Sequence, residues 1–289
     1  MDNPVDSGQT DSPSQRAAEP VATVPVFVER VLSYFSGWPD LRGAEPELWF
    51  RGISDVSQRL LPGAYWRKSC DEISLFLSFK NTAPMYLARE PLDEWDWYYV
   101  MQHYGLPTRL LDWSESPLVA LYFAIESCAG RAPCVWVLDP AALNAFTHGF
   151  TEGMIAVPGD DDTAKWLPRF CGRGRPALTF EANGFLADES GRAPVTRNNR
   201  KPIAIFARRS SPRIVAQRGV FTVHGGDEVP IDELLANANP RRLAPILIEP
   251  SACGGMLKDL RALGINKTTL FPEAQSVSDD LKRLYGVSP

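Results

Sequence analysis

The segment 102–124 constrains the fold of this chain most strongly, because a polar turn leads directly into an apolar helix. Its first half carries polar groups of the kind that bind ligands, and its second half is almost entirely apolar. Pro117 suits the first turn of a helix, and Ser114 or Ser116 can cap it. An apolar stripe then follows at helical spacing: Leu118, Leu121, Tyr122 and Ile125. The pattern predicts a buried helix over 116–128 with polar groups at its N-terminal end.

The order of the remaining patterns indicates the fold class. Helical spacing predicts helices around 27–36, 70–88, 92–104, 253–263 and 276–285. Short apolar runs predict strands at 47–52, 133–139, 201–206, 219–224 and 245–249. Helices are more frequent early and strands late, which favours an α+β fold over regular βαβ alternation.

The N-terminal end has a different composition from the rest. Residues 1–20 are rich in Asp, Ser, Gln and Pro, so we expect a disordered tail there. We expect residues 21–289 to form a single domain, since no repeat divides them.

Charge and cysteine content exclude several protein classes. The net charge of -5 argues against a globally basic nucleic-acid-binding protein. The five cysteines show neither CxxC spacing nor a zinc pattern with histidine, so we expect reduced thiols and no metal. No apolar run has the length of a membrane span, and the first twenty residues lack the features of a secretory signal. We therefore expect a cytoplasmic protein without membrane contact.

One segment is strongly basic, although the chain as a whole has a negative net charge. Residues 165–218 contain twelve Lys and Arg residues but only three acidic residues. This segment is either a solvated loop or a phosphate-binding face for a nucleotide or nucleic acid.

Four separated motifs resemble the FRG domain, which is named for its Phe-Arg-Gly signature. Trp49-Phe-Arg-Gly52 and the segment 102–124 carry the first half of this resemblance. Arg213-Ile-Val-Ala-Gln-Arg-Gly-Val-Phe221 and Gly264-Ile-Asn-Lys-Thr-Thr-Leu-Phe-Pro272 carry the second half. The resemblance runs from about residue 45 to about residue 285, so 21–289 would be a single FRG-type domain.

The same motifs are more weakly similar to arginine-class ADP-ribosyltransferases. Those enzymes carry a strand arginine, a serine motif followed by a helix of Ala-x-x-Phe-Ala type, and a late glutamate motif. Phe50-Arg51-Gly52, the run 112–124 and Ala216-Gln217-Arg218-Gly219 stand in these three places. The similarity implies a small, mainly antiparallel split sheet with surrounding helices, and NAD as the substrate.

The similarity also implies roles for several side chains. Arg51 would hold the pyrophosphate, and His103 or Asp112 would position the ribose. Ser114 would support the nicotinamide ribose, and Gln217 would hold the ribose 2′-hydroxyl or orient the acceptor. Gln217 stands where the family glutamate would be, and glutamine brings no negative charge.

Three further residues are candidates for ligand binding. Tyr104 could stack on a nicotinamide or another base. Trp113 and Ser114 precede the helix, where free N–H groups favour anions. Arg109 could bind the ligand or form an ion pair with Asp112.

Three functions follow from these patterns. The leading hypothesis is an ADP-ribosyltransferase-like enzyme that cleaves the glycosidic bond to nicotinamide. It would transfer ADP-ribose to a protein or nucleic acid, or to water. The second hypothesis is a non-enzymatic nucleotide- or nucleic-acid-binding module that uses the segment 165–218. A hydrolase using His103 and Asp112 ranks third.

Overall fold

The computed structural model describes residues 19–38, 45–67, 70–128, 130–150, 153–168, 171, 199–238 and 242–287. The expected disordered tail at 1–20 lies almost wholly outside these residues. Most of the segment between 169 and 198 lies outside them as well.

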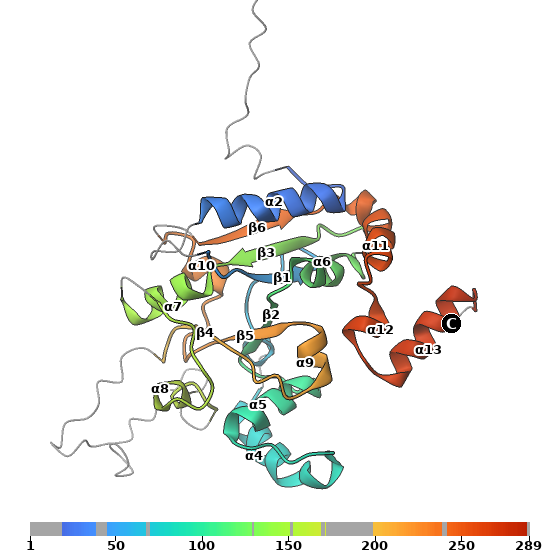
Figure 1. Cartoon of the computed structure of the whole chain (residues 1–289). Coiled ribbons are helices and arrows are strands. Elements are labelled where there is room, and N and C mark those ends of the chain that lie inside the picture. The colour runs from blue at the N-terminus through green and yellow to red at the C-terminus, as the bar shows by residue number, and fades with distance from the viewer. Residues whose placement is uncertain are drawn as a thin grey trace, which may run out of the picture.

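A six-stranded sheet organises the molecule (Figure 1). Its strands are β1 (Trp49–Ile53), β2 (Leu110–Ser114), β3 (Cys134–Leu138), β4 (Ile203–Ile205), β5 (Gly219–Val223) and β6 (Leu243–Leu247). The spatial order is β4-β5-β2-β1-β3-β6, and every neighbouring pair is antiparallel. The α+β class and the antiparallel sheet are therefore confirmed.

The sheet is continuous, which corrects the expectation of a split sheet. Its weakest junction is between β1 and β2, which share the single register pair Phe50↔Ser114. By contrast, β1 and β3 are paired over five positions. The two central strands therefore diverge immediately beyond Phe50, and a gap opens at the middle of one sheet.

Two groups of helices cover one face of the sheet. The first group is α2 (Val24–Gly37), α6 (Pro117–Ile125) and α11 (Cys253–Ala262), and its core includes Phe27, Phe50 and Leu121. The second group is α4 (Glu72–Thr82) and α5 (Glu94–His103), which pack on β2, β4 and β5 through Phe76, Tyr98 and Leu110. Both groups lie on the same face, because residues directly opposite each other in an antiparallel pair point to one side.

The opposite face is covered by α7 (Pro140–His148) and α10 (Ile231–Leu234), around buried Trp49, Trp113 and Leu143. Two C-terminal helices, α12 (Lys267–Leu270) and α13 (Ala274–Leu284), project beyond the edge of the molecule in Figure 1. Among the described residues, the remaining short helices are α3 (Gly63–Trp66), η1 (Pro84–Tyr86), α8 (Asp161–Ala164), α9 (Pro212–Ala216) and η3 (Pro250–Ala252).

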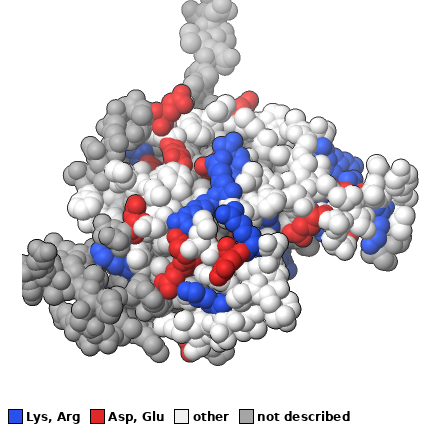
Figure 2. Space-filling view, turned by 60° about the horizontal axis from the view of Figure 1, so that its bottom comes forward, with Lys and Arg blue, Asp and Glu red and all other residues white. Residues whose placement is uncertain are grey.

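The described part of the basic segment carries much of its charge in ion pairs. Arg208 lies 2.6 Å from Asp93, and Arg209 lies 2.9 Å from Glu115. Arg200 and Arg218 also pair with carboxylates. Figure 2 accordingly shows basic and acidic side chains interleaved on the face turned towards the viewer. Arg169, Arg173, Arg175, Arg192 and Arg197 lie outside the described residues.

Candidate functional site

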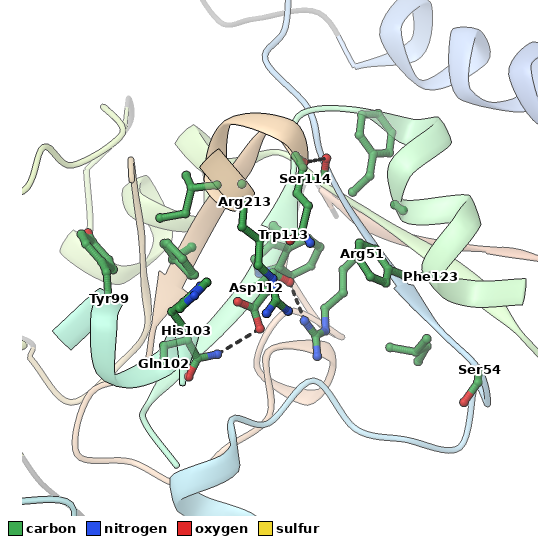
Figure 3. Close-up of a pocket in the computed structure, with 18 of the residues that line it drawn as sticks. Arg51, Ser54, Tyr99, Gln102, His103, Asp112, Trp113, Ser114, Phe123 and Arg213 are labelled. Atoms are coloured by element: carbon green, nitrogen blue, oxygen red, sulfur yellow. Dashed lines mark hydrogen bonds between the residues drawn. The ribbon is translucent and has the colours of Figure 1, made fainter. Parts of the chain in front are cut away.

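A cavity of about 390 Å³ lies where β1 and β2 diverge, between α5 and α6 (Figure 3). Strands β1, β2 and β5 contribute to its walls, as do helices α5, α6 and α9. Six predicted site residues line it: Arg51, His103, Asp112, Trp113, Ser114 and Gln217. The divergence of the strands thus brings together residues that lie up to 166 positions apart.

The Phe-Arg-Gly run gives each of its residues a different environment. Phe50 is 1% exposed and belongs to the core under α2 and α6. Gly52 faces α6 so closely that an added Cβ would lie 1.8 Å from the carbonyl oxygen of Ala120. Arg51 points to the opposite side of β1 and reaches the cavity. Two of the three residues therefore pack the helix against the strand, and the third is available to a ligand.

Arg51 bridges the gap between the diverging strands. Its Nη1 donates a hydrogen bond of 2.5 Å to the main-chain oxygen of Asp112, as Figure 3 shows. Its Nε is buried without a hydrogen-bond partner among the described residues. Burial lowers the pKa of the guanidinium and the nearby Asp112 opposes this, but arginine remains charged in proteins. A buried, charged donor without a partner is costly, so this site favours an anionic ligand.

Asp112 is held by a short chain of hydrogen bonds at the end of α5. Gln102 Nε2 donates to Asp112 Oδ2 over 3.0 Å, and the Thr108 hydroxyl donates to Gln102 Oε1. The carboxylate is solvent-exposed and lines the cavity. These contacts orient an acceptor of hydrogen bonds beside the Arg51 guanidinium. Gln102 was not predicted as a site residue, although it begins the segment 102–124.

His103 lies next to Gln102 at the end of α5 and lines the cavity. Burial lowers the pKa of its imidazole, the positive charge of Arg213 lowers it further, and Glu273 opposes both. Since the ordinary value is already about 6.5, the ring is neutral at pH 7 and has a nitrogen free to accept a proton.

Three predicted residues line the cavity but use their polar groups in the fold. Ser114 Oγ donates to the main-chain oxygen of Gln217 over 2.7 Å and accepts from the N–H of Ser116 over 2.9 Å. Gln217 Nε2 donates to the main-chain oxygen of Leu270 over 3.1 Å. The Trp113 ring is 3% exposed on the other face of the sheet, where its Nε1 donates to Thr222.

Arg109 and Tyr104, which were predicted to bind the ligand, do not line the cavity. Arg109 is fully buried, and its Nε donates to Glu72 over 2.6 Å. Its Nη1 and Nη2 donate to the main-chain oxygens of His224 and Trp166, and the alternative pair with Asp112 does not form. Tyr104 is 60% exposed and packs against Phe79.

Aromatic residues that were not predicted form much of the cavity wall. Tyr99 stacks on Phe221 with ring centroids 5.0 Å apart and planes at 15°. Phe123 from α6 lines the other side, and Arg213 from α9 also reaches the cavity (Figure 3). The sequence signal for Tyr99 and Phe123 is weak, because an aromatic residue in a helix usually belongs to the core.

Two structural findings concern membranes and metals. No helix among the described residues is long and apolar enough to cross a bilayer. Within the same part of the chain, no group of three or more His, Cys, Asp or Glu side chains is placed to hold a metal ion.

Comparison with known proteins gives one match. The sequence model of the FRG domain matches residues 46–131, which supports the FRG family. The matched region contains Arg51, His103 and Asp112, whereas Arg213 and Gln217 lie outside it. No curated protein and no solved structure matches the chain.

Proposed function

We propose that this chain is an ADP-ribosyltransferase-like enzyme that binds NAD and cleaves the glycosidic bond to nicotinamide. The observation that carries the proposal is the pair formed by Arg51 and Asp112 at the gap in the sheet. It sets a half-buried guanidinium, whose Nε is buried and unpaired, beside an oriented carboxylate. Both groups suit NAD, since its diphosphate is anionic and its ribose becomes positively charged as nicotinamide leaves.

In this mechanism, Arg51 binds the diphosphate and fixes the position of the dinucleotide. Asp112 is the carboxylate among the described residues that line the cavity. It accepts a hydrogen bond from a ribose hydroxyl and stabilises the oxocarbenium charge. The Gln217 amide group donates to Leu270, so Gln217 contributes by placing α9 against α12.

His103 and the aromatic wall complete the proposed site. The neutral imidazole of His103 can accept the proton of the attacking nucleophile, which is a protein or nucleic-acid acceptor or water. The Tyr99–Phe221 stack and Phe123 offer apolar surface for the nicotinamide or adenine ring.

The test is the release of nicotinamide from NAD by the purified full chain, followed chromatographically. We expect Asp112→Asn to lower the rate by about 10²–10³-fold, which is typical when one transition-state contact is lost. Arg51→Gln should weaken NAD binding. Arg59→Gln is the matched control, because Arg59 pairs with Asp232 and Glu233 outside the cavity. No nicotinamide release, together with a melting temperature that NAD does not change, would refute the proposal.

The alternative is a non-enzymatic module that binds nucleic acid through the segment 165–218. Its support is the excess of basic residues there, several of which lie outside the described part of the chain. The test is titration with single-stranded RNA and with duplex DNA across a range of salt concentrations. Affinity that falls steeply with salt would support this alternative, and absent binding would exclude it.

A further inference from the structure

Two arginines of the cavity differ from most arginines of the surrounding surface. Arg59, Arg200, Arg208, Arg209 and Arg218 each pair with a carboxylate. Arg51 and Arg213 line the cavity, and neither forms an ion pair with a carboxylate of the described residues. Two positive charges therefore face one cavity with Asp112 as the acidic residue.

Arg213 is held in place by an aromatic ring. It belongs to α9, whose start is capped by Ser211 accepting from the N–H of Ile214. The guanidinium carbon lies 4.7 Å from the ring centroid of Phe271, within the range of a cation–π contact. The charge also lies close enough to His103 to lower the pKa of its imidazole. Figure 3 shows Arg213 reaching towards Asp112 from the side of His103.

Phe271 in turn has a fixed position. Its ring packs edge-on against Phe123 of the cavity wall, with centroids 5.9 Å apart and planes at 84°. The preceding Leu270 is 1% exposed in the core, and its main-chain oxygen accepts the hydrogen bond from Gln217. The Phe123 ring and the buried Leu270 hold Phe271 in place, and the Phe271 ring contacts Arg213.

We propose that Arg213 is a second phosphate-binding residue, and that the cavity recognises its ligand through a diphosphate held between Arg51 and Arg213. This proposal rests on the proposed function and specifies how the ligand is recognised. Two guanidinium groups offset the two negative charges of a dinucleotide diphosphate. Asp112 is then left to interact with the ribose. Phe271 acts as a positioning residue, since it touches Arg213 and not the ligand.

The experiment is calorimetric titration of the full-length protein with ADP-ribose, NAD and inorganic pyrophosphate. The variants are Arg213→Gln, Phe271→Leu, Phe271→Tyr and Arg209→Gln. Arg209 is the control because it lies in the same segment but pairs with Glu115. We expect Arg213→Gln to weaken ADP-ribose binding about tenfold to a hundredfold, as for the loss of one charged hydrogen-bonding group. Arg209→Gln should leave the affinity within about twofold of that of the unchanged protein.

The Phe271 variants test the positioning role separately. Phe271→Leu removes the ring and should weaken ADP-ribose binding several-fold, whereas Phe271→Tyr keeps the ring and should restore it. Phosphorus NMR of bound ADP-ribose gives a further readout, since Arg213→Gln should shift a diphosphate resonance. Loss of stability elsewhere would not produce that shift.

The possible results separate this inference from the proposed function. If the protein binds ADP-ribose and NAD, and Arg213→Gln binds both equally well, the role of Arg213 is refuted and the proposed function stands. If pyrophosphate binds in an Arg213-dependent way but NAD does not bind, the diphosphate site is supported and the proposed enzyme is refuted. If none of the three ligands binds, both proposals are refuted.

Discussion

Replacing Gly52 by alanine tests whether the glycine of the Phe-Arg-Gly run serves packing or ligand binding. An added Cβ would lie 1.8 Å from the oxygen of Ala120 and 2.6 Å from the nitrogen of Ala124. Both atoms are main-chain atoms of the buried helix α6, so no side-chain rotation can relieve the overlap. The distance to Ala120 would have to grow to about 3.4 Å, which moves α6 away from β1.

The energetic cost of that movement is large. Overpacking a core costs about 1–3 kcal/mol and occasionally more, and a clash with helix backbone belongs at the upper end. We therefore expect Gly52→Ala to lower the free energy of unfolding by about 3 kcal/mol. With an m-value of about 3 kcal/mol/M, the urea midpoint would fall by about 1 M.

The measurement is equilibrium unfolding in urea, followed by circular dichroism and tryptophan fluorescence. Gly255→Ala is the matched control, because Gly255 is an exposed residue of α11 with no atom within 4 Å of an added Cβ. Its replacement should stabilise the protein by up to about 1 kcal/mol through helix propensity. An unchanged midpoint for Gly52→Ala would refute the close approach of α6 to β1.

Two further predictions concern buried side chains that can carry a charge. Glu72→Gln removes the carboxylate that neutralises the buried Arg109. It should lower the free energy of unfolding by about 3–5 kcal/mol. An unchanged urea midpoint would contradict the buried pair. Burial, followed by the charge of Arg109, lowers the pKa of His224 to about 3. The unfolded chain then binds a proton below about pH 6.5 that the folded chain does not, so stability falls with falling pH. Between pH 6.5 and 5 this effect amounts to about 1.6 kcal/mol. His224→Gln should flatten the measured pH dependence of unfolding by that amount, and an identical slope would be the contrary result.

Much of the secondary structure could be predicted from local patterns. The helix predicted over 116–128 is α6, and the apolar run 133–139 is β3. Periodicity succeeds there because buried faces repeat at the spacing of the element. The helix α7 was missed, although Asp139 caps it, Pro140 starts it and Gly149 ends it at a φ of 71°.

Six of the eight predicted site residues line the cavity, and a long-range contact takes Arg109 away from it. Arg109 and Asp112 are three residues apart, but Arg109 pairs with Glu72 of α4. A single sequence does not show which distant carboxylate will be buried beside an arginine. For the same reason, the contact of Gln217 with Leu270 was not foreseen. Arg51, His103 and Asp112 line one cavity because they lie beside turns and strand ends of recognisable elements, and their roles stay predictions.

The sequence alone determined the kinds of element, their order, and the concentration of polar groups before an apolar helix. These properties depend on residues close together in the chain, so spacing and composition are sufficient to read them. The tertiary structure decided which polar groups meet. The divergence of β1 and β2 after one register pair opens the cavity, and it leaves Arg51 with an unpaired donor. The packing of α12 against α9, with Arg213 over the Phe271 ring, places Arg213 at the same cavity. Those outcomes depend on strand register and on long-range packing, which only the folded chain establishes.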